Sequence, residues 1–508
     1  MSRKNLIFIC TDQLRFDALS VNGNRHVQTT HLDRIAEHGA TLVRHYTPNQ
    51  ICSPSRATMA TGLYPRHHGL WRNGVALDPT LPTLWNGLRT SGYATYAVGK
   101  LHYQPLLAPA ERDMPESLAW WERHDGGNWP ADFYGFEQVR LVLGDANESV
   151  HAGHYARWLA ARRPDAKALY APEAPRSEQA RDLPEVWKCA VAPELHYNHW
   201  IADQAISFIE GHDGSEGRPF CLYVSFPDPH HPFAPPWPYA DMFSPADMPT
   251  PTSVPGELER MPAYLQISDD PRKQAYIGAG ETVREQGFML RTEGISADTL
   301  ATAIAHTYGS VKMIDDAIGR ILAALQRSGR AEDTYLVLTS DHGEFLGDHG
   351  LLRKGPPPYR QLLQVPLLIS GPAVRPGLRS DALTSHLDLY PTLLSLLGVT
   401  PGASDGLDLS PLLAGTCQDV RDELFAEYHP RQDHSLYNRS LITKDWRYTC
   451  YPNHPEWGEL FDLRADPWEH HNLLGETDQQ ARSQALQRRL DQDFPTSPEV
   501  TAEILAPY

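Results

Sequence analysis

The sequence predicts an α/β fold in which a large, mostly parallel sheet is flanked by helices and followed by a small C-terminal α+β domain. Three observations lead to this fold class. The chain has 508 residues, 41% of them hydrophobic, which is enough for a large core and too long for one compact unit. Apolar runs of strand length alternate with helical patterns. The character of the sequence then changes after about residue 415.

The predicted elements alternate along the chain. Short apolar runs predict the strands Asn5–Cys10, Ala94–Val98, Phe220–Phe226, Tyr335–Thr339 and Leu367–Ser370. Longer periodic segments predict the helices Thr30–His38, Asn198–Glu210, Asp298–Gln326 and His386–Leu397. In the third helix, Val311, Ile314 and Ile318 recur at helical spacing, so we expect this stripe to be buried core and not a binding surface.

The domain organisation is predicted from changes in composition. We expect a catalytic α/β domain at 1–415 and a small antiparallel-sheet domain with a tail at 416–508. Two insertions are predicted. The insertion at about 105–196 is rich in tryptophan, proline and charged residues, and the insertion at about 229–295 is rich in proline. Long loops in compact domains are often functional, so part of the first insertion should border the substrate pocket. The apolar tail Ile504–Tyr508 suggests a contact in a homo-oligomer.

Charge and cysteine usage restrict the partners and the compartment. A formal net charge of −18 repels the phosphates of nucleic acid, which we therefore do not expect as a partner. The six cysteines are scattered without a C-x-x-C pair, which favours a reducing compartment. The apolar run Leu6–Cys10 is too short for a secretion signal, and no stretch approaches the length of a membrane span. We expect a cytoplasmic protein with no membrane partner.

Polar, reactive side chains follow four of the predicted strands at the point where each strand ends. In an open α/β sheet, ligands bind beyond the carboxyl ends of the parallel strands, so these side chains should meet although they are far apart in sequence. The residues concerned are Asp12 and Gln13, Lys100 and His102, His230 and His231, and Asp341 and His342.

A divalent metal follows from this set of side chains. Asp12 and Asp341 offer carboxylates, Gln13 a carbonyl oxygen and His342 an imidazole nitrogen. A set dominated by oxygen suits calcium, magnesium or manganese, and the nitrogen ligand tilts the choice toward manganese. Because an aspartate at a strand end is ordinarily a cap or turn residue, the prediction depends on several strand ends agreeing.

Cys52 is the most informative single residue. It precedes a short helical run, with Pro54 two residues and Arg56 four residues further on, which is a poor disulfide or zinc signature. A helix N-terminus directs N–H groups and a partial positive charge at its ligand, which suits an anion.

The C-x-P-x-R pattern of Cys52–Arg56, together with the motif Asp341–Gly350, resembles the signature of the formylglycine-dependent sulfatases of the alkaline-phosphatase superfamily. The resemblance covers most of the chain and extends to Glu459–Leu463 near the C-terminus. It implies an alkaline-phosphatase-like fold and the hydrolysis of small sulfate esters. It also implies that a formylglycine-generating enzyme converts Cys52 into an aldehyde whose hydrate is the nucleophile.

The resemblance assigns a role to each candidate residue. One divalent metal, Ca²⁺ or Mn²⁺, would be bound by the side chains of Asp12, Gln13, Cys52 (as formylglycine), Asp341 and His342. Arg56 and Lys100 would hold the hydrate, and Lys354 would contact a sulfate oxygen. His230 would protonate the departing alcohol, and His102 would accept a proton from the hydrate.

Two departures keep other functions open. Gln13 and His342 stand where many sulfatases have Asp and Asn, and this pair resembles phosphonate monoester hydrolases of the same superfamily. Asn73 matches an anion-contacting asparagine of that group, whereas Lys100 and His102 favour sulfate. The alternative function is therefore a phosphonate monoester hydrolase or phosphodiesterase. A further alternative is a non-catalytic, anion-binding relative in which position 52 remains a thiol.

Two other patterns are interpreted as structural. The adjacent histidines His67 and His68, and likewise His470 and His471, point apart on one element and are interpreted as surface or turn residues. The tryptophans of the first insertion are expected to pack in the core or in a lid and not to form a sugar platform.

Overall fold

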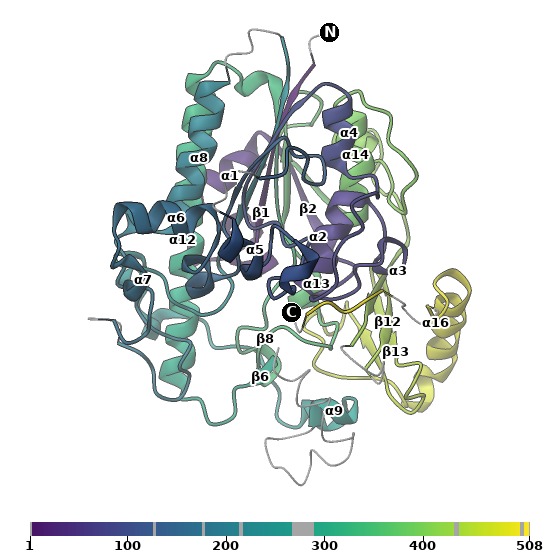
Figure 1. Ribbon diagram of the computed structural model, residues 1–508. Helices are drawn as coiled ribbons and strands as arrows, with labels where there is room; N and C mark the ends of the chain where they lie inside the picture. The colour runs from purple at the N-terminus through teal and green to yellow at the C-terminus, as the bar shows by residue number, and fades with distance from the viewer. Residues whose placement is uncertain are drawn as a thin grey trace.

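The computed structural model describes residues 3–124, 129–174, 178–212, 217–266, 289–430, 436–497 and 502–506. Its centre is an eight-stranded sheet with helices on both faces (Figure 1). The strands of this sheet are β1 (Asn5–Thr11), β2 (Gly39–Tyr46), β3 (Ala94–Gly99), β4 (Gln138–Leu141), β5 (Phe220–Phe226), β7 (Thr334–Ser340), β9 (Leu367–Ser370) and β10 (Leu378–Ser385).

The strand order is β10-β2-β9-β7-β1-β5-β3-β4. Pairing is parallel along β7-β1-β5-β3-β4 and between β10 and β2. β9 runs antiparallel to both of its neighbours, β7 and β2. The sheet is therefore mostly parallel, as predicted, and the carboxyl ends of its central strands lie at one edge.

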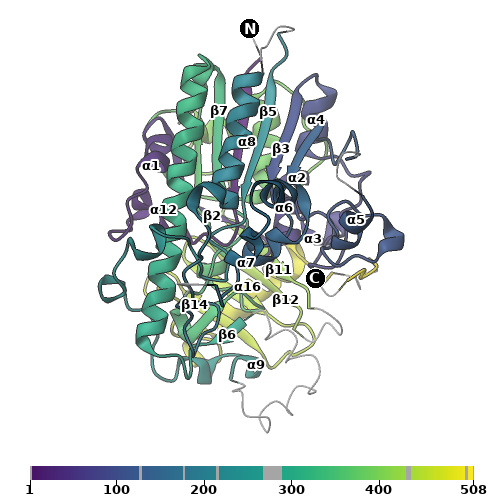
Figure 2. The ribbon, with the colours of Figure 1, turned by 60° about the vertical axis from the view of Figure 1, so that its left-hand side comes forward.

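Helices form a layer on each face of the sheet (Figure 1 and Figure 2). The helices of one layer are α1 (Thr30–Glu37), α6 (Gly153–Arg162), α8 (Tyr197–Gly211) and α12 (Ala297–Arg327). Those of the other layer are α2 (Cys52–Thr61), α4 (Leu84–Thr90), α5 (Leu118–Arg123) and α14 (Leu389–Leu396). β1 shows why two layers form, because Ile7 and Ile9 enter the first core and Leu6 and Phe8 enter the second.

The predicted strands and helices are confirmed to within a few residues at their ends. The stripe on α12 is core, with Val311, Ile314 and Ile318 buried. Three strands of the main sheet, β2, β4 and β10, were not predicted. Each of them includes charged or hydroxyl side chains, such as Arg44, so its hydrophobic run is interrupted and only pairing within the sheet identifies it.

A second, antiparallel sheet lies near the carboxyl ends of the central strands (Figure 1). Its strands are β11 (Glu423–Tyr428), β12 (Asn438–Thr443), β13 (Trp446–Cys450) and β14 (Gly458–Asp462), and it packs against α16 (Gln480–Asp493). This confirms the predicted small C-terminal α+β unit, whereas the boundary after residue 415 stays a prediction. Tyr359 of the catalytic part and Phe461 of β14 share one hydrophobic cluster, so the two sheets are joined by buried contacts.

Among the described residues, the other α-helices are α3 (Pro65–His68), α7 (Ala166–Leu169), α9 (Ala263–Gln266), α13 (Arg360–Leu363) and α15 (Ser410–Leu413), and β6 (Met289–Arg291) pairs with β8 (Leu351–Arg353) in a two-stranded sheet. Short 3₁₀ helices lie between these elements.

The insertion predicted at 105–196 contributes β4 to the edge of the main sheet. Its tryptophans pack together, and the ring centroids of Trp120 and Trp121 lie 5.2 Å apart. Both rings are buried in the core, as expected. In the Pro-rich insertion predicted at 229–295, residues 267–288 lie outside the described residues.

The described part of the predicted apolar tail lies against its own chain. The backbone N–H groups of Leu505 and Ala506 donate to the carbonyl of Gly74, at 2.8 and 3.3 Å. Pro507 and Tyr508 lie outside the described residues, so the predicted oligomer contact stays a prediction.

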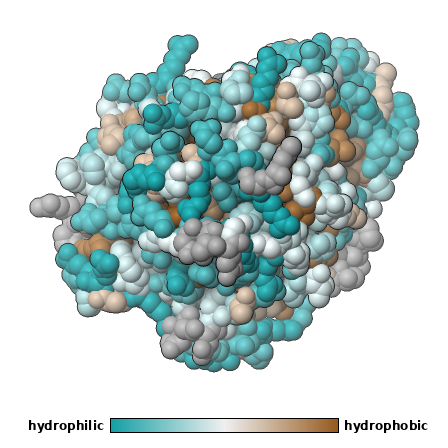
Figure 3. All heavy atoms as spheres, turned by 90° about the horizontal axis from the view of Figure 1, so that it is seen from above, coloured by the Kyte–Doolittle hydropathy of each residue, from teal (hydrophilic) through white to brown (hydrophobic). Residues whose placement is uncertain are grey.

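The surface over the amino ends of the central strands is mostly hydrophilic, with small apolar patches between hydrophilic residues (Figure 3). Within the described ranges, no helix is both long enough and apolar enough to cross a bilayer. All six cysteines are free thiols in the structure.

Candidate active site

The register of the main sheet brings the predicted strand ends together. β1 and β7 finish in register, and the next residues are Asp12 and Asp341. β5 and β3 finish beside them and lead to His230 and Lys100. Gly99 at the end of β3 has a φ of 102°, and a Cβ there would meet the carbonyl oxygen of the neighbouring strand at 1.7 Å. Only glycine therefore allows β3 to approach β5 this closely.

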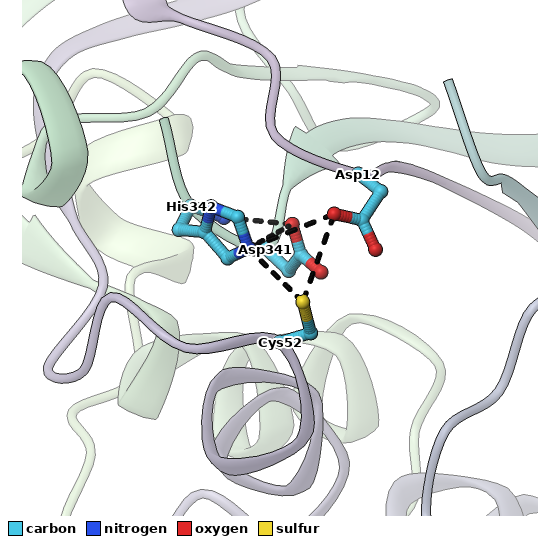
Figure 4. Close-up of side chains that lie close together, drawn as sticks. All are labelled: Asp12, Cys52, Asp341 and His342. Atoms are coloured by element: carbon cyan, nitrogen blue, oxygen red, sulfur yellow. Dashed lines mark hydrogen bonds and ion pairs between the residues drawn. The ribbon is translucent and has the colours of Figure 1, made fainter. Parts of the chain in front are cut away.

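Cys52 lies at the start of α2, with its thiol directed at three predicted metal ligands (Figure 4). Its Sγ is 3.8 Å from Asp12 Oδ1 and 3.2 Å from His342 Nε2. His342 Nε2 is 3.6 Å from Oδ1 of Asp12 and 3.6 Å from Oδ1 of Asp341. One ligand atom from each of the four residues lies within 4.8 Å of the others. The structure thus gathers most of the predicted metal set in one buried cluster.

The chemistry of this cluster fits a divalent cation. Burial and the neighbouring charge of Asp12 raise the pKa of Asp341, and a cation between the two carboxylates would lower it again. His342 Nδ1 lies 2.9 Å from the carbonyl of Gly343 and donates to it. In the neutral ring, this tautomer directs the Nε2 lone pair at the carboxylates, as a metal ligand requires.

Gln13 stands beside this cluster. Its φ is 65°, and its backbone N–H donates to Asp341 Oδ1 at 3.1 Å. Its side-chain oxygen accepts from Lys354 Nζ at 3.1 Å, and its amide nitrogen contacts Glu344. The side chain therefore borders both the metal ligands and Lys354, and its role as a ligand stays a prediction.

Arg56 holds the two carboxylates from behind. Its Nε donates to Asp341 Oδ2 at 2.8 Å, and its Nη2 donates to Asp12 Oδ2 at 3.1 Å. All three side chains are fully buried. Nη1 donates to the carbonyl of Lys100 at 2.9 Å, so the same guanidinium also fixes the end of β3. These contacts give Arg56 a positioning role toward the metal ligands.

Lys100 links the metal ligands to a residue that the sequence did not single out. Its Nζ lies 2.7 Å from Asp12 Oδ2 and 2.5 Å from Asp145 Oδ1. Asp145 follows β4 and forms a capping box with Glu148. Only 3% of the Lys100 side chain is exposed to solvent. The two carboxylates therefore stabilise the charge of a buried ammonium group.

Lys354 lies between Cys52, the predicted nucleophile, and His230, the predicted general acid. Its Nζ lies 2.9 Å from Cys52 Sγ and 2.8 Å from His230 Nε2. An ammonium can only donate, so His230 Nε2 accepts this hydrogen bond. His230 Nδ1 in turn donates to the carbonyl of His231 at 2.6 Å. Lys354 and His230 are therefore a hydrogen-bonded pair beside Cys52.

The charges around Cys52 favour its anionic form. Burial raises the pKa of the thiol, but the ammonium groups of Lys354 and Lys100 outweigh burial and hold the pKa well below its usual value. Cys10 is buried as well, and there burial raises the pKa to about 12. The site at position 52 is therefore built for negative charge, whereas a buried thiol elsewhere in the protein is not.

His102 stands on a loop that a buried glutamate organises. Its φ is 61°, and its backbone N–H donates to Glu116 Oε1 at 2.5 Å. Glu116 also accepts from the backbone of Tyr103 and Gln104, at 2.8 and 3.0 Å. Burial lowers the pKa of His102, which favours the neutral ring that a proton acceptor needs. Sequence reasoning missed Glu116, because only the fold brings it under this loop.

A cavity of about 370 Å³ opens above Cys52. It is lined by Cys52, Asn73, Lys100, His102, Gln104, Leu106, Glu116, Val142, Leu143, Gly144, Asp145, Glu148, Glu185, His230, His231, Pro232, Arg353 and Lys354. Part of this lining comes from the insertion predicted at 105–196, as expected. Asn73 accepts a hydrogen bond from the backbone N–H of Ser53 at 3.1 Å, so its side chain stands beside the first turn of α2.

Comparison with known proteins agrees with this geometry. Residues 4–399 match the family described as Sulfatase. The chain belongs to the sulfatase family. Residues 347–494 of this sulfatase-family protein also match the description "N-sulphoglucosamine sulphohydrolase, C-terminal". The predicted family and enzyme class, a sulfuric ester hydrolase, are confirmed.

Individual relatives span nearly the whole chain. The sulfatase-family protein is 28% identical to an arylsulfatase of Clostridium perfringens, over 96% of this chain and 94% of the relative. It is 30% identical to the multifunctional alkaline phosphatase superfamily protein PehA of Trinickia caryophylli, over 94% and 92%. A solved phosphonate monoester hydrolase of Agrobacterium radiobacter is similar with a TM-score of 0.75 and 25% identity, and the match covers 96% of this chain and 95% of that one. The alkaline-phosphatase-like fold is confirmed.

Proposed function

We propose that this sulfatase-family protein hydrolyses sulfate monoesters of the arylsulfatase type, with formylglycine made from Cys52 as the nucleophile and one Ca²⁺ or Mn²⁺ ion. The supporting observation is the position of Cys52. Its thiol touches Lys354 and two candidate metal ligands, and it lines a cavity large enough for a small ester. The buried cluster of two carboxylates and one imidazole is the site for the ion.

The two groups that the chain must acquire supply the electrophilic and nucleophilic chemistry. When bound, the cation polarises the sulfate oxygens. An aldehyde hydrate at position 52 offers one hydroxyl for attack at sulfur and a second hydroxyl whose loss of a proton releases sulfate, so no water need attack there. Asp12 and Asp341 hold their positions through the Arg56 guanidinium, which makes the ligand geometry rigid before any ion is bound.

The side chains of the cavity bind and orient the anion. Lys100 and Lys354 place two ammonium groups near Cys52, where they offset the negative charge of a sulfate ester. Asn73 lies beside the same helix start and offers its amide to an anion oxygen.

Proton transfers are assigned from the contacts of the histidines. His230 lies on the cavity wall beside Lys354, and once it is protonated at Nε2 it can pass that proton to the departing alcohol oxygen. His102 follows Lys100 by two residues and also lines the cavity. It is the proton acceptor for the hydrate in this proposal. Two separate histidines therefore serve the two halves of the reaction.

A specific observation favours a second function, phosphonate monoester or phosphodiester hydrolysis. The PehA relative is described as multifunctional, and the similar solved structure is a phosphonate monoester hydrolase. The pattern expected for such enzymes is matched by Gln13, Asn73 and His342. These residues lie beside Cys52 or beside the candidate metal ligands. Sulfate remains the preferred substrate of the proposal because Lys100 and His102 both face the cavity.

One enzyme preparation can decide between these functions. The protein is co-produced with a formylglycine-generating enzyme, loaded with Mn²⁺ or with Ca²⁺, and assayed with an aryl sulfate, an aryl phosphonate monoester and an aryl phosphodiester. We expect kcat/KM to be highest for the aryl sulfate. A higher kcat/KM for the phosphonate with both metals would show that the protein is a phosphonate monoester hydrolase and not an arylsulfatase.

Maturation needs its own test. Mass spectrometry of the Cys52 peptide from the native host should show formylglycine in place of the thiol. An intact thiol there would support the anion-binding relative without catalysis. Because the protein is proposed to be cytoplasmic, the modification should be found in the cytoplasmic fraction of that host.

A further inference from the structure

A second group of metal-binding side chain types lies outside the catalytic cavity. Glu257, His349 and His470 each offer one ligand atom, and these atoms lie within 4.8 Å of one another. None of the three lines the catalytic cavity. We refer to these three residues as the interdomain cluster, because they come from the Pro-rich insertion, from the loop after β7 and from the C-terminal part of the chain.

The carboxylate of Glu257 lies between the two imidazole rings. Its Oε2 is 2.6 Å from His470 Nδ1, and its Oε1 is 3.5 Å from His349 Nδ1. The two rings are 5.1 Å apart between centroids. The exposed fractions of the side chains are 5% for Glu257, 0% for His349 and 12% for His470. Among the described residues, His470 is therefore the most exposed member of the cluster and His349 is fully buried.

Two atoms of this cluster face each other without a hydrogen-bond partner. Within the part of the chain that the structure describes, neither Glu257 Oε1 nor His349 Nδ1 is hydrogen-bonded, and both are buried. A buried polar atom without a partner costs about 1–3 kcal/mol. A cation between the two atoms would satisfy both and would draw them together.

The surroundings orient His349 as a metal ligand. Its ring stacks on Tyr359 at 4.0 Å, and its Nε2 lies 3.0 Å from the side-chain amide of Gln361. The two ends of a glutamine amide have nearly the same shape, and Gln361 Oε1 has no partner among the described residues. With the amide turned over, Oε1 accepts the Nε2 proton, and Nδ1 directs its lone pair at Glu257.

The backbone holds His349 in a conformation that side-chain-bearing residues rarely adopt. Its φ is 58°, in the left-handed region. The conformation is fixed from both sides, since the N–H of His349 donates to the carbonyl of Thr252 at 2.8 Å and Asp348 accepts from Thr252 and Arg15. Such strain persists where the surrounding structure enforces it, often at binding sites.

From these observations we propose that the interdomain cluster of Glu257, His349 and His470 binds a second divalent metal ion of the zinc type. Two imidazole nitrogens and one carboxylate oxygen are a set that zinc accepts, with a fourth position left for water. Calcium and magnesium prefer sites made of oxygen ligands and fit this set poorly. The ion cross-links three distant segments of the chain, and the site is independent of the catalytic chemistry proposed above.

Zinc content provides the first test, with a matched control in the next residue. His470→Gln removes a ligand, whereas His471→Gln changes a neighbour that is 62% exposed and lies outside the cluster. Metal-free proteins are dialysed to equilibrium against Zn²⁺ as the added metal, and bound zinc is counted. The wild type and His471→Gln should hold about one zinc ion more than His470→Gln. Equal zinc content in the two variants would overturn the proposal. Zinc in the catalytic site cancels in this comparison.

Cobalt absorption and thermal stability provide the second test. Co²⁺ bound by nitrogen ligands has a visible absorption, which should be weaker in His470→Gln and Glu257→Gln than in His471→Gln. Zn²⁺ should raise the Tm of the wild type and of His471→Gln more than that of the two ligand variants. An equal rise in all four proteins would also refute the site. Glu257→Gln keeps the conclusion testable if His470→Gln does not fold.

Discussion

We call the side chains of Asp12, Cys52, Arg56, Asp341 and His342 at the carboxyl edge of the main sheet the catalytic edge. The catalytic edge and the interdomain cluster both contain histidines and carboxylates, but these residues are brought together by different means. Asp12 and Asp341 directly follow two neighbouring parallel strands, and the register of β1 and β7 determines where they stand. Glu257 and His349 lie in short 3₁₀ helices, and His470 lies in a loop. A parallel sheet therefore brings distant residues together in a predictable way, whereas loops do so only through the whole tertiary structure.

The two regions also differ in how their polar atoms are satisfied. At the catalytic edge, Arg56 donates to both carboxylates, so these side chains are held without an ion. In the interdomain cluster, Glu257 Oε1 and His349 Nδ1 have no hydrogen-bond partner among the described residues. Loss of Arg56 should therefore affect folding strongly, whereas substitutions in the cluster should act mainly through metal binding.

The largest effect is expected for Cys52→Ala. Loss of the proposed nucleophile should lower kcat/KM for an aryl sulfate on the order of 10⁴-fold or more, with little change in folding. Cys417→Ala serves as control, because Cys417 is a free thiol outside the cavity. Measured kcat/KM and circular dichroism of both variants test this. If Cys52→Ala retained substantial activity, the reaction would not take place at Cys52.

Arg56→Met should cause the largest loss of stability. It leaves Asp12 and Asp341 buried without their common partner, which should cost about 3–5 kcal/mol in the free energy of unfolding. In the control, Arg89→Met breaks an exposed pair with Asp132 and should cost about 0–1 kcal/mol. Urea unfolding of the metal-free proteins measures both values. Similar losses in the two variants would contradict the view that the catalytic edge is held without an ion.

His230→Gln should reduce kcat by about 10²–10⁴-fold for sulfate esters of weakly acidic alcohols. The loss should be much smaller for esters with a good leaving group, because such a group departs without protonation. His67→Gln, at an exposed histidine that pairs with Asp405, is the control. A loss that does not depend on the leaving group would show that His230 acts in binding and not as an acid.

Glu116 should make stability depend on pH. Burial raises its pKa from 4.5 to about 7, so the folded state binds a proton that the unfolded state releases. The contribution of Glu116 to stability is therefore lost as the pH rises from about 4.5 to about 7, by up to about 3 kcal/mol. Unfolding at several pH values should show this dependence in the wild type and a flatter one in Glu116→Gln. The same profile in both proteins would argue against a protonated carboxyl under the His102 loop.

The smallest effect is expected for His470→Gln in the absence of metal. It removes one hydrogen bond to Glu257 and should cost about 1 kcal/mol. His471→Gln should change the free energy of unfolding by still less. Urea unfolding in the presence of a chelator measures both. A loss of several kcal/mol in His470→Gln would mean that the interdomain cluster, like the catalytic edge, is stable without an ion.

Much of the catalytic site could be predicted from the sequence because chemistry and strand ends coincide there. The positions of Asp12, Asp341 and Lys100 follow from apolar strands that stop at a polar residue. Asp145 and Glu116 could not be found in this way. Asp145 reaches Lys100 only because β4 pairs with the edge of the sheet, and β4 is a short strand of mixed polarity.

His470 illustrates the opposite case. An adjacent pair of histidines in a turn is ordinarily a surface feature, and His471 is indeed exposed. His470 differs from its neighbour because the C-terminal part of the chain packs against the loop of His349 and the turn of Glu257. Nothing in the local sequence distinguishes the two histidines.

The sequence alone determined the α/β class and the main strands, and it indicated the candidate nucleophile and the candidate metal ligands, because hydrophobic periodicity and short motifs act over a few residues. Tertiary structure alone decided the direction of β9, the partners of Lys100 and His102, and the meeting of Glu257 with two histidines. These features depend on contacts between segments that are distant in sequence, and the free energy of such contacts comes from packing that no local pattern records.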